Sequence, residues 1–484
     1  MLLSFIFLIL IFTILALFFV PGTNIFLLRI IGLTSSGFVL FFSTILLILF
    51  DTKTSFFQFI EYYQLGLPSL NLAFSFGLDG ISIYFFLLTS FLFFLCILFV
   101  WNEILLKEYL ICLLLIELLL LLVFSVLDLL LFYVFFEAIL IPMFLLIGIW
   151  GSRERKLRAV YLLFFYTLVG SVLMLLGILY IYSIHGSLNL EYLLTCTFTF
   201  NEQYWLWLAF FLSFASKVPM FPFHIWLPEA HVEAPTVGSV LLAGILLKLG
   251  VFGFLRFSLT LFPQASFYFS PLVYLLSICG VIYASFSAIR QTDFKRIIAY
   301  SSVSHMNLVT LGIFSFNIIG LEGSIMQSIS HGFVSSAMFF MIGILYDRYH
   351  SRLLYYYGGL VHAMPVYAAI FLIFTMANIA LPGTSSFVGE FLLLLGIFKM
   401  NILAAVFGAL GVILCGAYSL WLYNRLIFGN LKVSYTLRFK DLDSREFYIV
   451  APLVVFVLLM GIYPTFFLDA IHFSTYNLST VTLN

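Results

Sequence analysis

Charged side chains are scarce in this 484-residue sequence. Asp, Glu, Lys and Arg together make up 9% of it, whereas about a quarter is usual in a soluble domain. Hydrophobic residues make up 64%, and the mean hydropathy is +1.19. This balance excludes a soluble globular enzyme. Because 21 basic residues balance 21 acidic ones, charge gives no reason to expect nucleic acid as a partner, and lipid is the expected surrounding.

The sequence also lacks the motifs that hold common cofactors. Its cysteines form no CxxC pair and no Cys/His cluster, so they predict no zinc site, iron–sulfur cluster or disulfide framework. We interpret them as small core residues: Cys96, Cys112, Cys196, Cys279 and Cys415. No GxGxxG follows a strand pattern, and no phosphate-binding P-loop motif is present. We therefore expect no cofactor or metal in this chain, and any energy source would be on another chain.

Targeting signals are missing from the first residues as well. Residues 1–20 have neither the basic start of a signal peptide nor the Arg and Ser content of a transit peptide, so they predict a retained first span. The 61 phenylalanines suit an AT-rich genome. A chain this hydrophobic that carries no presequence is typical of synthesis inside an organelle.

Apolar runs dominate what is present. A spanning helix needs about 20 apolar residues, and the runs predict fourteen spans within one integral membrane domain, residues 1–484: 2–20, 26–50, 79–101, 109–127, 129–150, 159–184, 205–224, 235–258, 270–289, 295–316, 322–347, 365–399, 402–428 and 446–468. The polar and aromatic segment 51–77 contains Gly66, Pro68 and Gly77, and it predicts a surface loop or hairpin.

The distribution of Lys and Arg supports this count. Most of the 21 lie in connections that follow odd-numbered spans, including the run SRERKLR at 152–158, whereas connections after even-numbered spans hold only Lys53, Arg256 and Lys399. Basic loops gather on one side of a membrane. We call that side the basic-loop face, and we expect both termini on the opposite face.

Two predicted spans are broken by proline. The seventh carries Pro219 and Pro222 beside Lys217, and the twelfth is interrupted by LPG at 381–383 before Glu390. Proline removes a backbone donor, and such breaks are tolerated in a membrane where protein or a water-filled cavity satisfies the freed groups. Paired breaks in two halves of a transporter indicate its ion path.

The spacing of the breaks predicts an internal repeat. They lie five helices apart, and an odd offset reverses topology, so helices 4–8 and 9–13 are expected to form two inverted five-helix units. These units span 109–258 and 270–428, preceded by three helices in 1–101 and followed by a last helix at 446–468.

Ionisable residues inside the predicted spans are the candidates for chemistry. Each costs at least about 2.5–3.5 kcal/mol to insert, so a function is the default interpretation. The interior candidates are Glu117, Glu137, Lys217, Lys248, His305, His331 and Glu390, and Asp128, His224 and Asp347 lie closer to span ends. His305 and His331 suit a proton relay because neutral imidazole both donates and accepts, although a core role is also open.

Glu137 has no basic residue in its own span, so its partner must come from another helix. Two unit charges 4 Å apart interact by about 4 kcal/mol at an effective dielectric of about 20, enough to change a protonation state. Lys217 is the proposed partner, and the pair would exchange protons. Alternatives remain for each residue. Lys248 could extend from a packing helix toward the membrane surface. Glu137 and Glu390 could each form a structural pair that does not transfer protons, and Glu117 and Asp128 could serve structure only.

The region after the seventh span leaves two interpretations open. His224, Glu229, His231 and Glu233 either order a loop through hydrogen bonds or take part in proton traffic.

Six strings resemble the antiporter-like proton-channel subunits of respiratory complex I, and within that family the subunit 4 branch in plants, algae and protists. They are FGLDGIS (76–82), LDLLLFYVFFEAILIPMFLLIGIWG (127–151), KVPMFPFHIWLPEAHVEAPTVGSVLLAGILLKLG (217–250), KRIIAYSSVSHMNLV (295–309), SHGFVSSAMF (330–339) and LPGTSSFVGEF (381–391). The long string from 217 to 250 is highly specific.

The resemblance implies residue roles. Glu137 matches the family's helix 5 glutamate, Lys217 and Lys248 its helix 7 and helix 8 lysines, and Glu390 its terminal helix 12 residue. Glutamate there, rather than lysine, favours the subunit 4 branch over the subunit 2 and subunit 5 paralogues. Those paralogues are the implied neighbours in the membrane arm, with lipids such as cardiolipin around them.

The resemblance also implies an activity and a location. Proton translocation across the mitochondrial inner membrane would be driven by NADH oxidation and ubiquinone reduction, with NADH, FMN, iron–sulfur clusters and ubiquinone held by partner subunits. The basic loops would face the matrix and both termini the intermembrane space. Two rivals remain: a subunit of a multisubunit sodium/proton antiporter, and a scaffold whose channel is silent.

Overall fold

The computed structural model describes residues 1–64, 73–101, 103–432 and 440–483, and most of them are helical. The prediction of a mostly helical membrane protein is therefore confirmed. The chain divides into two compact units. The first comprises Met1–Lys217, Lys248–Phe269 and Asp469–Asn484, and the second comprises Val218–Leu247 and Ser270–Leu468.

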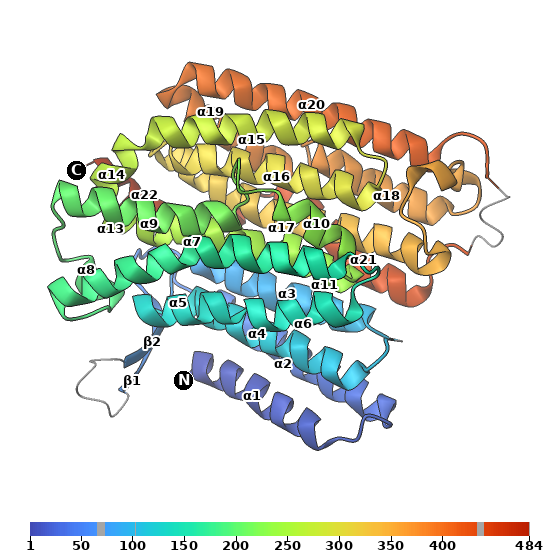
Figure 1. Ribbon diagram of the computed structural model, residues 1–484, viewed down its shortest axis with the longest axis horizontal. Helices are drawn as coiled ribbons and strands as arrows, with labels where there is room; N and C mark the ends of the chain where they lie inside the picture. Colours follow the sequence, from blue (N-terminus) through green and yellow to red (C-terminus); the bar gives the residue numbers. More distant parts are fainter. Residues whose placement is uncertain (65–72, 102, 433–439, 484) are drawn as a thin grey trace. The chain divides into compact units, whose positions relative to one another are not determined.

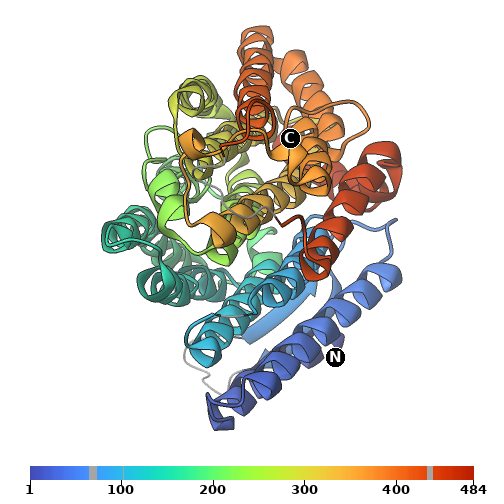
Figure 2. The same ribbon diagram turned by 90° about the vertical axis from the view of Figure 1, so that its right-hand side faces the viewer.

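The first unit begins with helices that run alongside one another (Figure 1). Its elements are α1 (Leu2–Phe19), α2 (Ile25–Leu49), β1 (Gln58–Gln64), β2 (Ala73–Leu78), α3 (Ser82–Phe99), α4 (Leu106–Ser125), α5 (Leu129–Ala138), α6 (Leu140–Trp150), α7 (Lys156–His185), α8 (Leu190–Leu193), α9 (Phe200–Lys217), nearly all of α12 (Leu247–Gly253), the π-helical η2 (Phe254–Ser258), α13 (Leu259–Leu261), α14 (Pro263–Tyr268) and most of α22 (Thr465–Leu483). Figure 2 shows α1 and α2 side by side in blue.

The second unit contains longer helices. Its elements are α10 (Trp226–Glu233), α11 (Thr236–Leu241), the π-helical η1 (Leu242–Leu246), α15 (Ser270–Arg290), α16 (Phe294–Ile313), α17 (Ile318–Tyr349), the short 3-10 turns η3 (Leu354–Tyr356) and η4 (Leu360–His362), α18 (Pro365–Asn378), α19 (Ser385–Met400), α20 (Ile402–Ile427) and α21 (Ser444–Ile462). The α17 helix is buried along nearly its whole length, so it forms the centre of this unit.

Eleven helices in the described part of the chain are long and apolar enough to cross a membrane. They coincide with eleven of the predicted spans. The other three predicted spans, 205–224, 295–316 and 365–399, correspond to α9, to α16 and to the pair α18 and α19. Because these helices are shorter or more polar, the structure supports a multi-pass membrane protein without fixing the number of crossings.

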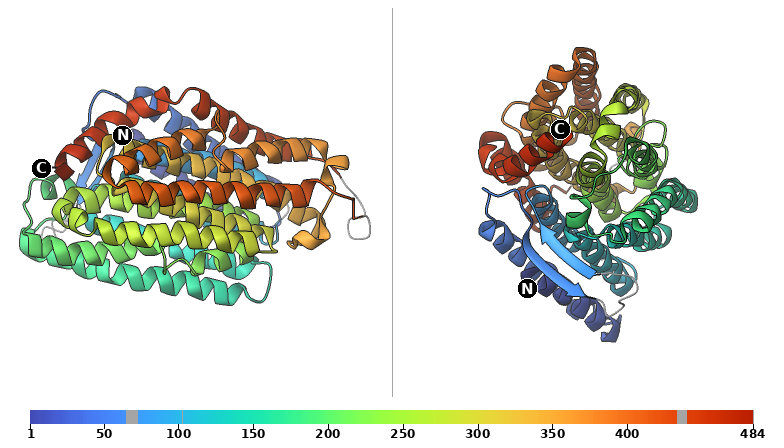
Figure 3. Two further views of the ribbon diagram at one scale, coloured as in Figure 1. Left: turned by 90° about the horizontal axis from the view of Figure 1, so that it is seen from above. Right: turned by 90° about the vertical axis from the view of Figure 1, so that its left-hand side faces the viewer.

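The predicted surface hairpin at 51–77 is confirmed where the structure describes it. The strands β1 and β2 pair in antiparallel register, with Tyr62 opposite Ser75 and Tyr63 opposite Phe74 (Figure 3, right). The predicted turn residues Gly66 and Pro68 lie outside the described residues.

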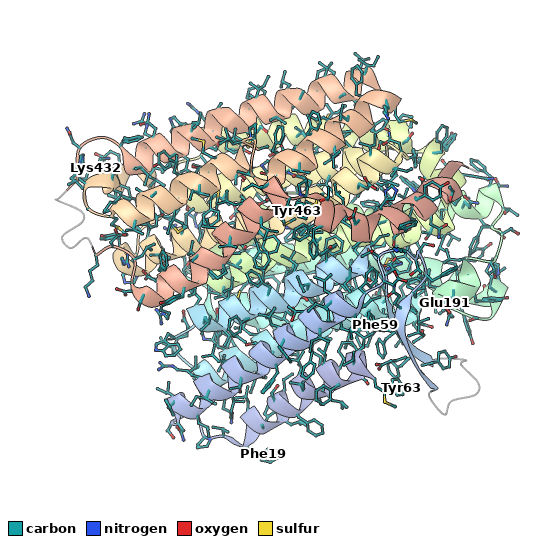
Figure 4. The ribbon with its side chains drawn as sticks, turned by 180° about the vertical axis from the view of Figure 1, so that it is seen from behind. Phe19, Phe59, Tyr63, Glu191, Lys432 and Tyr463 are labelled. Atoms are coloured by element: carbon teal, nitrogen blue, oxygen red, sulfur yellow. The ribbon has the colours of Figure 1, made fainter. Side chains whose placement is uncertain are left out.

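Proline ends several helices, as the sequence indicates, but earlier than predicted. The α9 helix ends at Lys217 rather than 224, because Pro219 and Pro222 cannot donate to the helical ladder. The twelfth span is broken between α18 and α19, as expected. The last predicted helix ends at Ile462, before Pro464, and Tyr463 marks the bend into the unpredicted α22 (Figure 4).

Asparagine and aspartate fix where many helices begin. Asn24, Asp128 and Asp293 each accept a hydrogen bond from a backbone N–H in the first turn of the helix that follows. Asp443 and Glu446 form a reciprocal capping box at the start of α21. Such caps satisfy N–H groups that have no partner within the helix.

A buried ion pair ties the loop before α3 to η2. The Arg256 guanidinium donates to both carboxylate oxygens of Asp79, at 2.8 and 2.6 Å, and lies over the rings of Phe57 and Phe252. Burial alone would raise the pKa of Asp79, but Arg256 and hydrogen bonds from Ser82 outweigh it and hold the pKa below its ordinary value.

Replacing Arg256 by methionine is expected to destabilise the protein by about 3–5 kcal/mol, because it leaves the Asp79 carboxylate buried without its partner. The double variant R256M/D79N should recover part of this loss. The measurement is the midpoint of thermal unfolding, with exposed Lys53→Met as the control.

A lowered folded pKa of Asp79 means that the ion pair stabilises fully above the ordinary value of 3.8 and loses its effect as pH falls below it. An equal loss in the K53M control would contradict this interpretation.

Candidate functional site

The first unit brings together Glu137 and Lys217, the acid and base that the sequence singles out. Glu137 lies at the end of α5, and Lys217 is the last residue of α9 and only 3% exposed. The two side chains are close enough to interact electrostatically. The Lys217 ammonium also lies 4.4 Å from the ring centroid of Phe136, the residue before Glu137. The pair therefore shares one partly apolar environment in which either group can hold a proton.

A break in the helix places Glu137 at a helix end. The span 129–150 is divided at Ile139 into α5 and α6. Pro142 lacks a backbone N–H and its ring crowds the carbonyl of Ala138, which accounts for the division. The Oε1 atom of Glu137 has no hydrogen-bond partner among the described residues. This oxygen is therefore available as a proton acceptor.

Lys248 occupies an unusual helix. It is fully buried within α12, and the π-helical segments η1 and η2 lie before and after that helix. A π-helical turn leaves backbone carbonyls without their usual partners and is often found at functional sites. The surrounding span, Thr236–Leu261, is buried at every residue except Thr260. A lysine in this position cannot reach lipid headgroups, so the snorkelling alternative loses its support.

The second unit brings together His305, His331 and Glu390. The Nδ1 atom of His305 lies 3.0 Å from Oε1 of Glu390, and the imidazole centroids of His305 and His331 are 5.7 Å apart. Each of the three side chains is at most 5% exposed. They come from α16, α17 and α19, so the cluster exists only in the folded unit.

Three further residues extend this cluster, and sequence reasoning missed all of them. Gln327 donates through Nε2 to Glu390 at 2.9 Å. Cys415, interpreted above as a core residue, places its sulfur 3.5 Å from Nε2 of His305 and accepts from the Tyr418 hydroxyl at 2.9 Å. Imidazole therefore has a polar neighbour on each ring nitrogen. A small cavity of about 10 Å³, roughly the room for one water molecule, adjoins His305, Glu390 and Cys415.

A close approach of α17 and α19 holds Glu390 in place. A Cβ atom on Gly389 would lie 2.6 Å from Oε1 of Gln327 and 2.7 Å from its Cα, so only glycine fits there. Small residues at such contacts let helices in membranes approach closely. Gly389 thereby brings the neighbouring Glu390 within reach of Gln327 and His305.

The weaker candidates have different environments. Glu117 on α4 is fully buried, and neither of its carboxylate oxygens has a hydrogen-bond partner among the described residues. Asp128 caps α5 by accepting from Leu130 and Leu131, and burial raises its pKa although these hydrogen bonds oppose the rise. His224 stacks on Phe221 and meets the ring of Tyr283 edge to face. Asp128 therefore has an evident structural role, whereas Glu117 has none.

No group of His, Cys, Asp and Glu suited to a metal ion occurs within the described ranges. The site consists instead of acids and bases set into helices. What such groups can do chemically is to take up, hold and release protons.

A family model described as "NADH:quinone oxidoreductase/Mrp antiporter, TM" matches residues 126–415. The chain belongs to this family. NADH-ubiquinone oxidoreductase chain 4 of Arabidopsis thaliana is 54% identical to it over 96% of this chain and 94% of its own length. The resemblance to the subunit 4 branch, stated from the sequence, is confirmed.

Solved structures of the family share the fold. A chain in respiratory complex I from Thermus thermophilus, solved with bound NADH, superposes with a TM-score of 0.90 at 33% identity over 100% of both chains. A chain in the Mrp complex of a Dietzia species gives a TM-score of 0.86 at 20% identity over 100% of both chains, a likeness of fold.

The family match contains most of the candidate site. It includes Asp128, Glu137, Lys217, His224, Lys248, His305, His331, Glu390 and Cys415, but Glu117 lies outside it. The family's defining segment therefore contains both the Glu137–Lys217 pair and the cluster around His305.

Replacing Gly389 by alanine is expected to destabilise the protein by about 1–3 kcal/mol, because the added methyl forces α19 away from Gln327. The midpoint of thermal unfolding measures this. The matched control is Gly148→Ala on α6, where nothing lies within 4 Å of the new methyl. There alanine should be neutral or stabilising by up to about 1 kcal/mol, because it favours helix. Equal effects of the two substitutions would show that the Gly389 contact is unimportant.

Proposed function

We propose that this chain is a chain 4 subunit of respiratory complex I and carries protons through its buried acids and bases. The observation that supports this most directly is the place of Lys217, a buried amine whose nitrogen lies 4.4 Å from the ring centroid of Phe136, the residue before Glu137. The 54% identity to a chain 4 protein over 96% of the sequence supports the assignment to the complex.

The pair in the first unit acts as a store for one proton. With Lys217 as ammonium and Glu137 as carboxylate, the charges attract each other. When the proton moves from Lys217 to Glu137, a neutral amine and a neutral carboxylic acid remain, and both are easier to hold in an apolar interior. A change in separation or in nearby charge therefore decides where the proton sits.

The cluster in the second unit acts as a relay. His305 contacts Glu390 through Nδ1 and Cys415 through Nε2. An imidazole that takes a proton on one nitrogen releases another from the opposite nitrogen, so the proton advances without the ring leaving its place. Glu390 is the acid that gives or receives the proton at Nδ1. His331, in the same unit, is a further member of this relay, and Lys248 is a further proton-transfer group of the first unit.

The remaining features follow from the same assignment. We place fourteen spans in the membrane, with inverted repeats at helices 4–8 and 9–13, and the basic loops on the matrix side of the mitochondrial inner membrane. NADH oxidation and ubiquinone reduction belong to other subunits, which hold the NADH, FMN, iron–sulfur clusters and ubiquinone. The neighbours are the subunit 2-like and subunit 5-like paralogues and lipids such as cardiolipin.

Replacing Lys217 by alanine, or Glu137 by glutamine, is expected to slow proton flux through this chain by about a hundred-fold or more, because each removes a proton-transfer group. The assembled complex is reconstituted in vesicles, and the number of protons pumped per NADH oxidised is measured. Exposed Lys399→Ala is the matched control. A normal proton-to-NADH ratio in both variants would refute the proposed function and favour a silent scaffold.

The same vesicles separate this proposal from the sodium/proton antiporter alternative. A complex I subunit should co-purify with NADH-oxidising activity, and pumping should require NADH and quinone. Sodium-dependent proton exchange in particles that do not oxidise NADH would favour the antiporter.

A further inference from the structure

A second cluster of ionisable residues lies in the second unit, at the end nearest the basic-loop face. Lys295, near the start of α16, is 2% exposed, and its ammonium donates to the carbonyl of Ala234 at 3.0 Å. That carbonyl follows the last residue of α10, Glu233. The C-terminal end of a helix carries partial negative charge and favours a cation. Lys295 is therefore held directly beside Glu233.

Glu233 is buried without full compensation. Its side chain is 2% exposed, and its Oε2 atom has no hydrogen-bond partner among the described residues. It interacts electrostatically with Lys295. A salt bridge at 2.8 Å joins Glu229, one turn before Glu233 on α10, to Arg296, the residue after Lys295 on α16, and keeps the two helices together. The unsatisfied oxygen of Glu233 is a ready acceptor for a proton.

Other charged groups face Lys295 from the neighbouring segments. They are Asp293 at the cap of α16, Asp347 near the end of α17, and Arg352 beyond it, and the ring of Tyr346 lies 5.8 Å from the ammonium. Arg296 also acts on Asp293 and is paired with Glu229. With Glu233, four carboxylates then face three cations, which leaves one negative charge in excess. Burial raises the pKa of Asp293 even though Arg352 and Lys295 oppose the rise. Such a cluster favours holding an additional proton.

Exposure falls steadily across this cluster. Asp347 is exposed, Lys295 and Glu233 are each 2% exposed, and His231 is fully buried and stacks on Phe339 with ring centroids 4.8 Å apart. The groups therefore lead from the surface to the interior of the unit.

The helices that hold this cluster also hold the relay. On α16, ten residues separate Lys295 from His305, a rise of about 15 Å, and on α17 sixteen residues separate Asp347 from His331, about 24 Å. Buried serines lie between the two levels: Ser301, Ser302 and Ser304 on α16, and Ser335 and Ser336 on α17. A hydroxyl both donates and accepts, so it can pass a proton along.

We propose that Asp347, Lys295 and Glu233 form a proton port that connects the basic-loop face to the His305 and Glu390 relay within the second unit. The Asp347 carboxylic acid gives its proton to the neutral amine of Lys295 and is reprotonated from the aqueous side. The Lys295 ammonium then gives a proton to the Glu233 carboxylate, which leaves an amine and a carboxylic acid. Glu233 passes this proton along the serine hydroxyls of α16 to the neutral imidazole of His305, which becomes imidazolium, and the Glu233 carboxylate is restored. The inference rests on the proposed function, because the port serves the same proton transfer.

The test uses the assembled complex in vesicles, with the variants Glu233→Gln and Asp347→Asn. Both keep the size of the side chain and remove its proton-carrying group. Proton delivery through the port should slow about ten-fold or more in E233Q. In D347N it should slow mainly when the pH at the basic-loop face is raised, where protons are scarce. The matched control is Glu154→Gln, an exposed acid in the loop 152–158, which should pump normally.

A proton carrier differs from a purely structural residue in its response to small weak acids. Formate added at the basic-loop face should restore pumping in D347N, because formic acid can supply the missing proton. If E233Q fails to assemble, the exposed D347N decides alone. Normal pumping in D347N at all pH values, or a loss that formate does not reverse, would overturn the port. If K217A or E137Q abolishes pumping while E233Q and D347N pump normally, the port fails and the proposed function stands.

Discussion

The constraint on which this structure depends is the cost of holding ionisable groups in an apolar interior. Each such group costs a few kcal/mol in a membrane, so it persists only with a partner or a task. A bidentate ion pair between Arg256 and Asp79 offsets this cost. Two other acid–base pairs reduce this cost differently, because moving one proton from the base to the acid leaves both groups neutral. They are Glu137 with Lys217 and His305 with Glu390. The first kind stabilises the fold, and the second allows chemistry.

The helix breaks follow from the same constraint. A freed backbone carbonyl in lipid is costly, so irregular backbone is confined to protein-lined regions. The break at Ile139 lies beside Glu137, α9 ends at Lys217, and the break before α19 lies close to Glu390 in sequence. Irregular backbone therefore occurs close to a buried or half-buried acid or base, because each makes the site more polar and lowers the cost of the other.

Local sequence signals predict where helices lie and which polar residues they bury, because hydropathy and proline act over a few residues. Tertiary pairs are harder to predict: Lys217 was proposed for Glu137 because a buried acid needs a basic partner, but no such rule led to the neighbours of His305 and Glu390. Gln327 was detectable, since it precedes His331 by four residues and shares its helix face. Cys415 gave no signal, because only the approach of α20 to α16 makes a thiol significant. Pro142 was a signal that the helix over 129–150 would divide. The continuous hydropathy of that segment led to the prediction of a single span instead.

The two units use different bases: a lysine amine in the first and a histidine imidazole in the second. The two bases differ in how many atoms exchange protons. Lys217 has a single nitrogen with three N–H donors when protonated, so every group that exchanges a proton with it must lie within hydrogen-bond reach of that one atom. His305 presents two nitrogens to two different neighbours, Glu390 and Cys415. A proton can therefore enter and leave His305 on opposite sides while the ring stays fixed. The imidazole thus bridges two neighbours that lie on opposite sides of the ring, whereas the amine serves neighbours around a single point. After each transfer His305 has changed tautomer, so a ring flip or a returned proton must reset it before the next transfer in the same direction.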